Sequence, residues 1–215
     1  MHGLTGHRDH TWTAATKKVP WPEELLSQDI PDARIITYGY NADVVHWTRP
    51  ASQNTVREHA RNLVNDLAAI RQKTPKSVGR PIIFVAHSLG GLVCEDAIFT
   101  CNNPTSSAQR DILDSVRGLI FLGTPHAGSD FTMFATAVAD IIRLSLVKTP
   151  NKGILQVLKR NSEVLANIEN DFLTLVRTRA EGGRGHIKLH SFVEELPVTA
   201  MGHVGFSATL TSSRV

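Results

Sequence analysis

One stretch of this 215-residue sequence limits the fold more than any other. Residues 81–86 read Pro-Ile-Ile-Phe-Val-Ala, a continuous apolar run that is typical of a strand buried on both faces of a parallel sheet. His87, a serine, a leucine and two glycines follow, and residues 89–100 have the pattern of a helix that starts directly behind the strand. This order of strand, tight turn and helix predicts an α/β fold.

The other segments alternate in the same way. Further strands are expected at 33–39, 116–122 and 187–193, and further helices at 22–27, 55–73, 130–147 and 154–180. This alternation predicts a mostly parallel sheet with helices on both faces. We expect one domain over residues 1–198, followed by an irregular tail over 199–215.

Composition excludes several classes of protein. Hydrophobic residues make up 41% and the formal net charge is only +3, with basic residues scattered, so no nucleic-acid partner is expected.

Cys94 and Cys101 lie on one expected helix and are predicted to be buried thiols, in a reducing compartment. Nothing calls for a metal or another cofactor, and no apolar run reaches the roughly 20 residues of a transmembrane helix. Any membrane association is therefore expected to be peripheral.

Ser88 stands at the turn between strand and helix. This is the pattern of a nucleophile elbow, in which small residues around the serine let the turn close and expose the hydroxyl at the carboxyl end of the sheet. Ala86 and Gly90 take the two small positions. The N–H of Leu89, at the helix N-terminus, is expected to bind a developing oxyanion. The alternative is an ordinary serine N-cap followed by flexible glycines.

A second loop fits the same chemistry. Residues 2–6 read His-Gly-Leu-Thr-Gly, and the N–H of Leu4 is the second expected oxyanion donor.

Four segments together carry a family resemblance. They are His-Gly-Leu-Thr-Gly-His at 2–7, Ile-Thr-Tyr-Gly-Tyr at 36–40, Ile-Ile-Phe-Val-Ala-His-Ser-Leu-Gly-Gly-Leu-Val at 82–93, and Gly-Leu-Ile-Phe-Leu-Gly-Thr-Pro-His-Ala-Gly-Ser at 118–129. The chain resembles the SERAC-type, DUF676-like family of lipase-like serine hydrolases. Similar domains stand at the N-terminus of fungal proteins with NACHT or NB-ARC modules.

The resemblance implies an α/β-hydrolase fold and cleavage of a lipid or other acyl ester, with phospholipid remodelling in one branch. It also implies an intracellular setting at a mitochondrial or endoplasmic-reticulum membrane, with the cytoplasm as the alternative.

The acid of a catalytic triad is expected after the strand at 187–193. Glu194 stands there, and Glu-x-Leu-Pro matches the family pattern. Asp130 is the second candidate, although a role in charging the start of the next helix is expected for it.

The base is harder to assign. His203 is the only histidine after Glu194 and follows it by nine residues, which is too few for the further strand that normally precedes the base. We expect His87 to pack in the elbow and His126 to shape its turn. His186 and His190 are expected in the last strand and its loop.

Both ends of the sequence are expected to stop within the fold, because Met1 stands directly before the His-Gly pair and no strand follows Glu194. Three hypotheses therefore stay open: an active serine esterase, a hydrolase scaffold that binds a lipid or partner without turnover, and a truncated product of a complete hydrolase.

Overall fold

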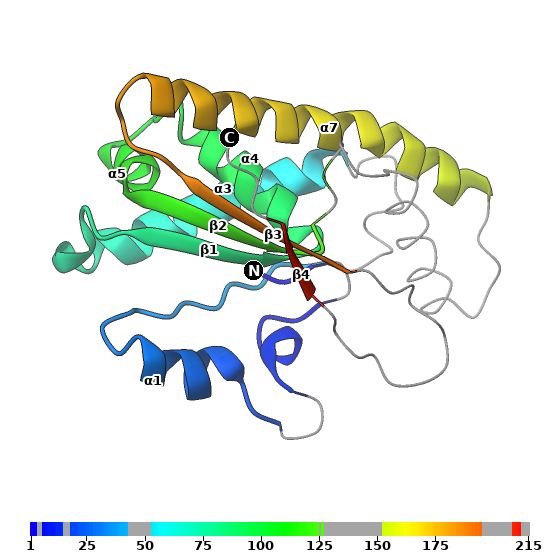
Figure 1. Cartoon of the computed structure of the whole chain (residues 1–215). Coiled ribbons are helices and arrows are strands. Elements are labelled where there is room, and N and C mark those ends of the chain that lie inside the picture. Colours follow the sequence, from blue (N-terminus) through cyan, green and yellow to red (C-terminus); the bar gives the residue numbers. More distant parts are fainter. Residues whose placement is uncertain are drawn as a thin grey trace.

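The computed structural model describes residues 1–3, 6–14, 18–42, 53–124, 126, 152–194 and 208–211. They form an α/β fold around one sheet, with strands in the order β1-β2-β3-β4 (Figure 1). The strands are β1 (Ile82–His87), β2 (Val116–Leu122), β3 (Lys188–Glu194) and β4 (Ala208–Thr211). The first three strands are parallel and β4 is antiparallel to β3. The carboxyl ends of β1, β2 and β3 therefore lie at one edge of the sheet.

The helices confirm most of the predicted ones. They are α1 (Ser27–Asp29), α3 (Gln53–Gln72), α4 (Gly90–Thr100), α5 (Ser107–Ser115) and α7 (Lys152–Glu181), with short turns η1 (His10–Trp12), η2 (Pro22–Leu26) and η4 (Pro75–Ser77). The helices α3, α4 and α7 lie on one side of the sheet, and the segment that contains α1 lies on the other (Figure 1). The expected helix at 130–147 lies outside the described residues.

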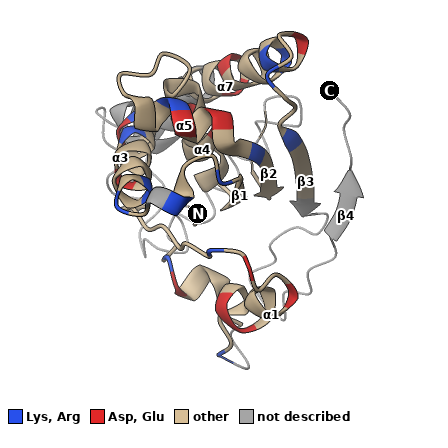
Figure 2. Cartoon of the chain, turned by 90° about the vertical axis from the view of Figure 1, so that its left-hand side faces the viewer, with Lys and Arg blue, Asp and Glu red and all other residues tan. Residues whose placement is uncertain are grey.

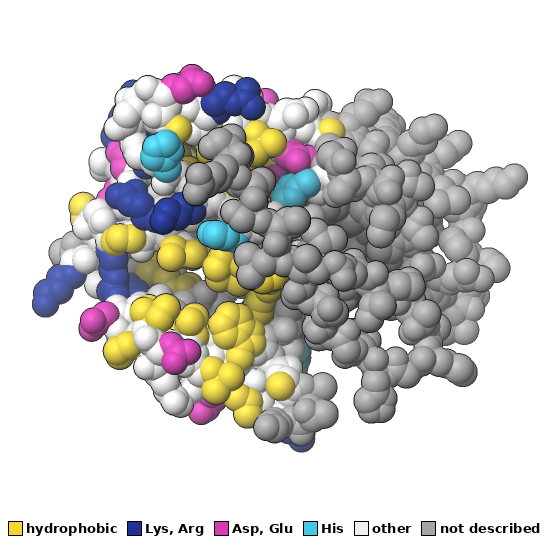
Figure 3. Space-filling model, viewed as in Figure 1, with side chains coloured by type: hydrophobic (Ala, Val, Ile, Leu, Met, Phe, Trp, Pro, Cys, Tyr) yellow, Lys and Arg dark blue, Asp and Glu magenta, His cyan; other side chains and the backbone are white. Residues whose placement is uncertain are grey.

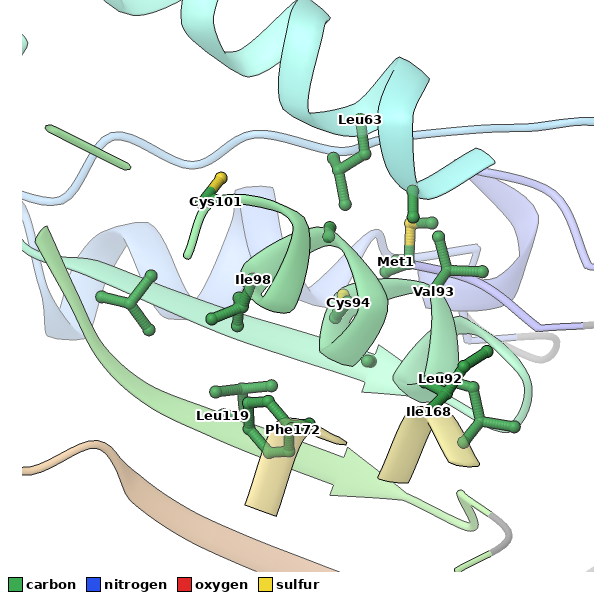
Figure 4. Packing of buried hydrophobic residues seen from close by; sticks show 14 of the residues in the cluster. Met1, Leu63, Leu92, Val93, Cys94, Ile98, Cys101, Leu119, Ile168 and Phe172 are labelled. Carbon is green, nitrogen blue, oxygen red and sulfur yellow. The ribbon is translucent and has the colours of Figure 1, made fainter. Parts of the chain in front are cut away.

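Helix α4 is the centre of the core. Every residue from Gly90 to Ile98 is buried, and the helix contacts β1, α3 and α7. Figure 4 shows Leu63 of α3 on one side of α4, and Leu119 of β2 beside Phe172 of α7 on the other. A helix that is apolar around most of its circumference is stable only when protein covers it on all sides, so the helix behind Ser88 has little freedom to shift.

The two cysteines are buried in this core as free thiols, as predicted. Both belong to the apolar cluster that packs around α4. Burial raises the pKa of the Cys94 thiol to about 12, so this side chain serves as packing.

A buried ion pair joins α3 to α5. Arg71 Nη2 lies 2.7 Å from Asp111 Oδ2, and the same guanidinium donates to Ser115 Oγ at 2.9 Å. Figure 2 shows positions of both charge signs close together along these helices. The opposite charges and the added hydrogen bond offset the cost of taking both groups out of water.

Helix α5 has no counterpart among the predicted elements. Its N-terminus is fixed by Ser106, whose hydroxyl accepts the N–H of Gln109 at 3.3 Å, while Gln109 Oε1 accepts the N–H of Thr105 at 2.8 Å. These bonds resemble a capping box, except that Gln109 accepts the N–H of Thr105 instead of that of the N-cap Ser106; the Ser-x-x-Gln spacing at 106–109 was the sequence signal for it.

The strand predicted at 33–39 is wrong. The segment is extended, but no other described strand forms a ladder with it. Apolar, β-branched sequence is not enough, because a strand needs a neighbour that takes up its N–H and C=O groups. Ile36 is consequently 46% exposed and Ile83 of β1 is 63% exposed. Hydrophobic side chains gather on this side of the molecule (Figure 3).

The tail is not wholly irregular. Residues 208–211 pair with β3, and Glu194 lies opposite Ala208. A short strand therefore follows His203, where the sequence had predicted only irregular backbone. The division into a domain at 1–198 and a tail at 199–215 remains a prediction.

We expect Leu119→Ala to lower the free energy of unfolding by about 2–5 kcal/mol, because it opens a cavity in a fully buried site between β2 and the helix layer. Urea denaturation followed by circular dichroism measures the change. Ile83→Ala, on the neighbouring strand but 63% exposed, is the control and should cost less than about 1 kcal/mol. Equal losses in the two variants would contradict this description of the core.

Candidate active site

Ser88 occupies a sharp turn between β1 and α4. Its φ angle is +50°, in the left-handed region that side chains other than glycine rarely adopt, at a cost of about 1–3 kcal/mol. The N–H of Ser88 donates to Leu122 O at 2.8 Å, and the Ser88 carbonyl accepts the N–H of Gly91 at 3.0 Å. Hydrogen bonds on both sides of the turn thus hold the strained residue in place. This strand-turn-helix geometry is the one that the sequence predicts.

The two glycines after Ser88 are required by close packing. A Cβ atom on Gly90 would lie 2.3 Å from the carbonyl oxygen of His2. A Cβ atom on Gly91 would lie 2.3 Å from Thr124 Oγ1, in the loop that follows β2. Real Cβ contacts are never this short, so any side chain here would push a neighbouring loop away. The start of α4 is therefore the surface on which two loops meet.

The N-terminal segment forms the first of these loops. Met1 pairs with the outer edge of β1: its ammonium donates to Val85 O at 2.9 Å, and its carbonyl accepts the N–H of His87 at 3.0 Å. Gly3 then lies against the serine, because a Cβ atom on Gly3 would be 2.6 Å from Ser88 Cβ and 3.1 Å from Ser88 Oγ. The loop that was predicted to supply an oxyanion donor thus lies directly beside Ser88.

Of the two predicted oxyanion donors, Leu89 and Leu4, only Leu89 lies in the described part of the chain. Leu89 is the N-cap of α4 and is buried, and within the described part of the chain no acceptor is found for its N–H. An N–H at this position points along the positive end of the helix dipole. Leu4 lies outside the described residues.

The predicted acid, Glu194, lies at the same edge of the sheet as Ser88. Glu194 is the last residue of β3, and His87, Leu122 and Phe192 lie side by side across β1, β2 and β3. Ser88 and Glu194 therefore both follow this row at the carboxyl edge of the sheet. The side chain of Glu194 is outside the described part, and so are Asp130 and His203.

His126 makes a contact that sequence reasoning missed. Its Nε2 lies 3.0 Å from Glu95 Oε1, and its ring packs edge-on against Phe121 with centroids 4.7 Å apart. Glu95 belongs to α4 and is 1% exposed. The pair ties the loop after β2 to the helix behind Ser88, which agrees with the turn-shaping role predicted for His126.

Glu95 and His126 influence each other's protonation. Burial raises the pKa of the Glu95 carboxyl, and the hydrogen bond to His126 opposes that rise. Burial acts to lower the pKa of His126, but the hydrogen bond and charge of Glu95, with the charge of Glu169, outweigh it and raise that pKa. Both shifts favour a pair that holds one proton through neutral pH.

The other histidines have separate places. His87, the last residue of β1, is exposed rather than packed in the elbow as predicted. His186 precedes β3 and His190 lies on it, as predicted, and both are exposed. Glu95 had one sequence signal, a carboxylate inside an otherwise apolar helix, whereas the packing of Thr124 on Gly91 had none.

Comparison with known proteins agrees with the resemblance. The family model described as "Putative serine esterase (DUF676)" matches residues 1–180. The chain belongs to this family. No solved structure matches it significantly.

Similar full-length proteins are known. The chain is 26% identical to Protein SERAC1 of Bos taurus and 25% identical to Protein SERAC1 of Homo sapiens, in each case over 92% of this chain. It spans about 30% of the length of these relatives.

Among the described residues, none of the helices is long and apolar enough to cross a membrane. Within the same ranges, no group of three or more His, Cys, Asp or Glu side chains is placed to hold a metal ion.

We expect Gly90→Ala to slow covalent labelling of Ser88 by a fluorophosphonate about 10- to 100-fold, because the new methyl group displaces the His2 carbonyl and with it the loop beside Ser88. Labelling is followed by intact-protein mass spectrometry. Gly182→Ala, at the far end of α7, serves as the matched control and should label at the rate of the unmodified protein. A Gly90→Ala protein that labels equally fast would show that this close approach is not needed.

We expect Glu95→Gln to lower the pKa of His126, because the charged hydrogen-bond partner is lost while burial remains. An NMR titration of the ring C–H signals measures the pKa. Glu169→Gln removes a charge that raises this pKa by less than Glu95 does, so it should give a smaller decrease. An unchanged pKa in the Glu95→Gln protein would contradict the pairing.

Proposed function

We propose that this chain is a serine esterase in which Ser88 is the nucleophile. The observation that carries the proposal is the strained turn at Ser88, with Gly3 packed against it and the N-terminus of α4 behind it. A serine at such a turn is exposed to a bound ester, and N–H groups from two loops surround the position of the carbonyl oxygen. In this proposal the N–H groups of Leu89 and Leu4 bind the oxyanion.

Glu194 and His203 are the proposed acid and base. The connection between β3 and β4 starts at Glu194 and returns at Ala208, which lies opposite it, so both ends of this connection are at the edge that carries Ser88. His203 lies five residues before Ala208, a span of up to about 17 Å of extended chain. Two strand spacings separate β1 from β3, roughly 10 Å. These lengths support a base delivered from this connection despite its short distance from Glu194 in sequence.

The proposed reaction follows from these groups. Ser88 Oγ attacks the ester carbonyl carbon while its proton passes to His203, and the carbonyl oxygen becomes an oxyanion. Collapse of this intermediate breaks the bond to the alcohol, which takes the proton from His203. Water then attacks the acyl-enzyme in the same way and releases a carboxylic acid. Glu194 orients and stabilises the cationic imidazole in this scheme.

A lipid acyl ester is the proposed substrate class. Family membership supports an ester, and the exposed side chains of Ile36 and Ile83 offer apolar contact for an acyl chain or a lipid surface. Phospholipid remodelling and a peripheral place at a mitochondrial or endoplasmic-reticulum membrane belong to this proposal on the family resemblance alone. A series of p-nitrophenyl esters from acetate to palmitate tests it, with turnover expected to rise with acyl length.

We expect Ser88→Ala to abolish fluorophosphonate labelling and to reduce ester hydrolysis at least about 10³-fold, because the nucleophile is removed. His203→Ala and Glu194→Gln should each lower kcat about 10²- to 10⁴-fold. Labelling is followed by mass spectrometry and hydrolysis by absorbance.

Ser107→Ala and His190→Gln, both at exposed positions, are the matched controls and should keep full activity. A folded protein whose serine does not label, and which binds lipid equally well with Ser88→Ala, would replace this proposal by that of a non-catalytic binding module.

A further inference from the structure

The imidazole of His2 is fixed on both sides. The side chain is buried, with 1% of the residue exposed. Nδ1 lies 3.0 Å from the carbonyl oxygen of Gly3, and Nε2 lies 3.1 Å from the amide nitrogen of Tyr40. Because the Tyr40 N–H is a donor, Nε2 must accept and carries no proton. Nδ1 therefore carries the proton and donates to Gly3, which defines one neutral tautomer.

Stacked rings connect His2 to the core. The ring of His2 lies parallel to that of Tyr40, with centroids 4.6 Å apart and an interplanar angle of 8°. The other contact of Tyr40 is with His59 of α3, also at 4.6 Å. Tyr40 itself packs against the apolar core. The ring of His2 thus joins the extended segment 34–42 to the N-terminal loop.

The same loop determines what surrounds Ser88. Gly3, which accepts the Nδ1 hydrogen bond, is the residue packed against Ser88 Cβ and Oγ. The carbonyl of His2 is the group packed against Gly90. A shift of the His2 ring is therefore passed directly to both contacts at the elbow.

We propose that His2 is a positioning residue whose neutral ring holds the N-terminal loop against Ser88, and that protonation of this ring releases the loop and inactivates the site in acid. A protonated ring presents an N–H to the Tyr40 N–H, so the acceptor is lost and two donors face each other. The inference rests on the proposed function for its effect on activity, but the state of the ring can be measured without it.

The surroundings of the ring oppose a positive charge. Burial lowers the pKa of His2, and the nearby Met1 ammonium and His7 lower it further, while the bond to Gly3 opposes them. From β1 and α3, His87 and His59 lie within reach of its charge, and Glu58 acts on His59. Tyr40 and Cys94, whose pKa values burial raises, stay neutral.

Because the pKa of His2 is lowered, the folded protein loses stability as the pH falls. The neutral ring contributes its full stability above pH 6.5, the ordinary histidine value. That contribution is lost as the pH falls below 6.5, because the unfolded chain then takes up a proton that the folded ring refuses.

The test compares the unmodified protein with His2→Gln and His2→Phe. In His2→Gln the side-chain oxygen can accept the Tyr40 N–H and cannot titrate, so labelling of Ser88 should stay within about threefold at pH 7.5. In His2→Phe only the stacking remains, and labelling should fall about tenfold or more. The exposed His190→Gln is the matched control.

A second measurement separates His2 from the proposed catalytic base, whose own protonation also slows labelling in acid. The protection factor of the Tyr40 amide against hydrogen exchange should fall between pH 7.5 and 5.5 in the unmodified protein and stay constant in His2→Gln. Nitrogen NMR of the histidine rings should find the Nδ1–H tautomer of His2 at pH 7.5. Because ring and amide are also observed in the unmodified protein, a variant that fails to fold does not prevent the test.

A cationic or Nε2–H ring at pH 7.5, or a Tyr40 amide whose protection does not change with pH in the unmodified protein, would overturn the inference. Failure of Ser88 to label in the folded, unmodified protein would instead overturn the proposed function, and the ring and amide measurements would still decide the role of His2.

Discussion

The site depends on how closely three pieces of backbone approach Ser88. Ser88, with φ of +50°, directly follows the strand β1, and its N–H donates to Leu122 O of β2. Gly90 and Gly91 leave space that the His2 carbonyl and Thr124 fill. A side chain at either glycine would separate these pieces. The strained backbone of Ser88 persists because the helix that follows it, α4, is buried from Gly90 to Ile98 and cannot shift to relieve the strain.

Hydrogen bonds of two histidines hold the two loops against the start of α4. His2 bonds Gly3 and Tyr40 on the side of the N-terminal loop, and His126 bonds Glu95 on the side of the loop after β2. Both histidines are held in place by hydrogen bonds to protein groups. Their pKa shifts are opposite. Burial lowers the pKa of His2, whereas the hydrogen bond and charge of Glu95 outweigh burial and raise the pKa of His126.

The sheet topology supports the proposal that Glu194 and His203 act together with Ser88. Parallel strands bring their carboxyl ends to one edge of the sheet, so Ser88 and Glu194 both lie at that edge. Because β4 returns antiparallel from the same edge, the connection that contains His203 both leaves and re-enters beside it. An antiparallel return needs no crossover helix, so β4 can follow β3 after a short connection.

The sequence by itself determined the strands β1, β2 and β3, the helices α3, α4 and α7, and the turn at Ser88, because apolar periodicity and small residues around the serine are local signals. It also predicted a strand at 33–39, where Ile and Tyr have high strand propensity. Only the tertiary structure decided that this segment has no ladder partner among the described strands, since pairing depends on a neighbour that is distant in sequence. The bonds of His2 to Tyr40 and of His126 to Glu95 span 38 and 31 residues, so no local pattern could reveal them.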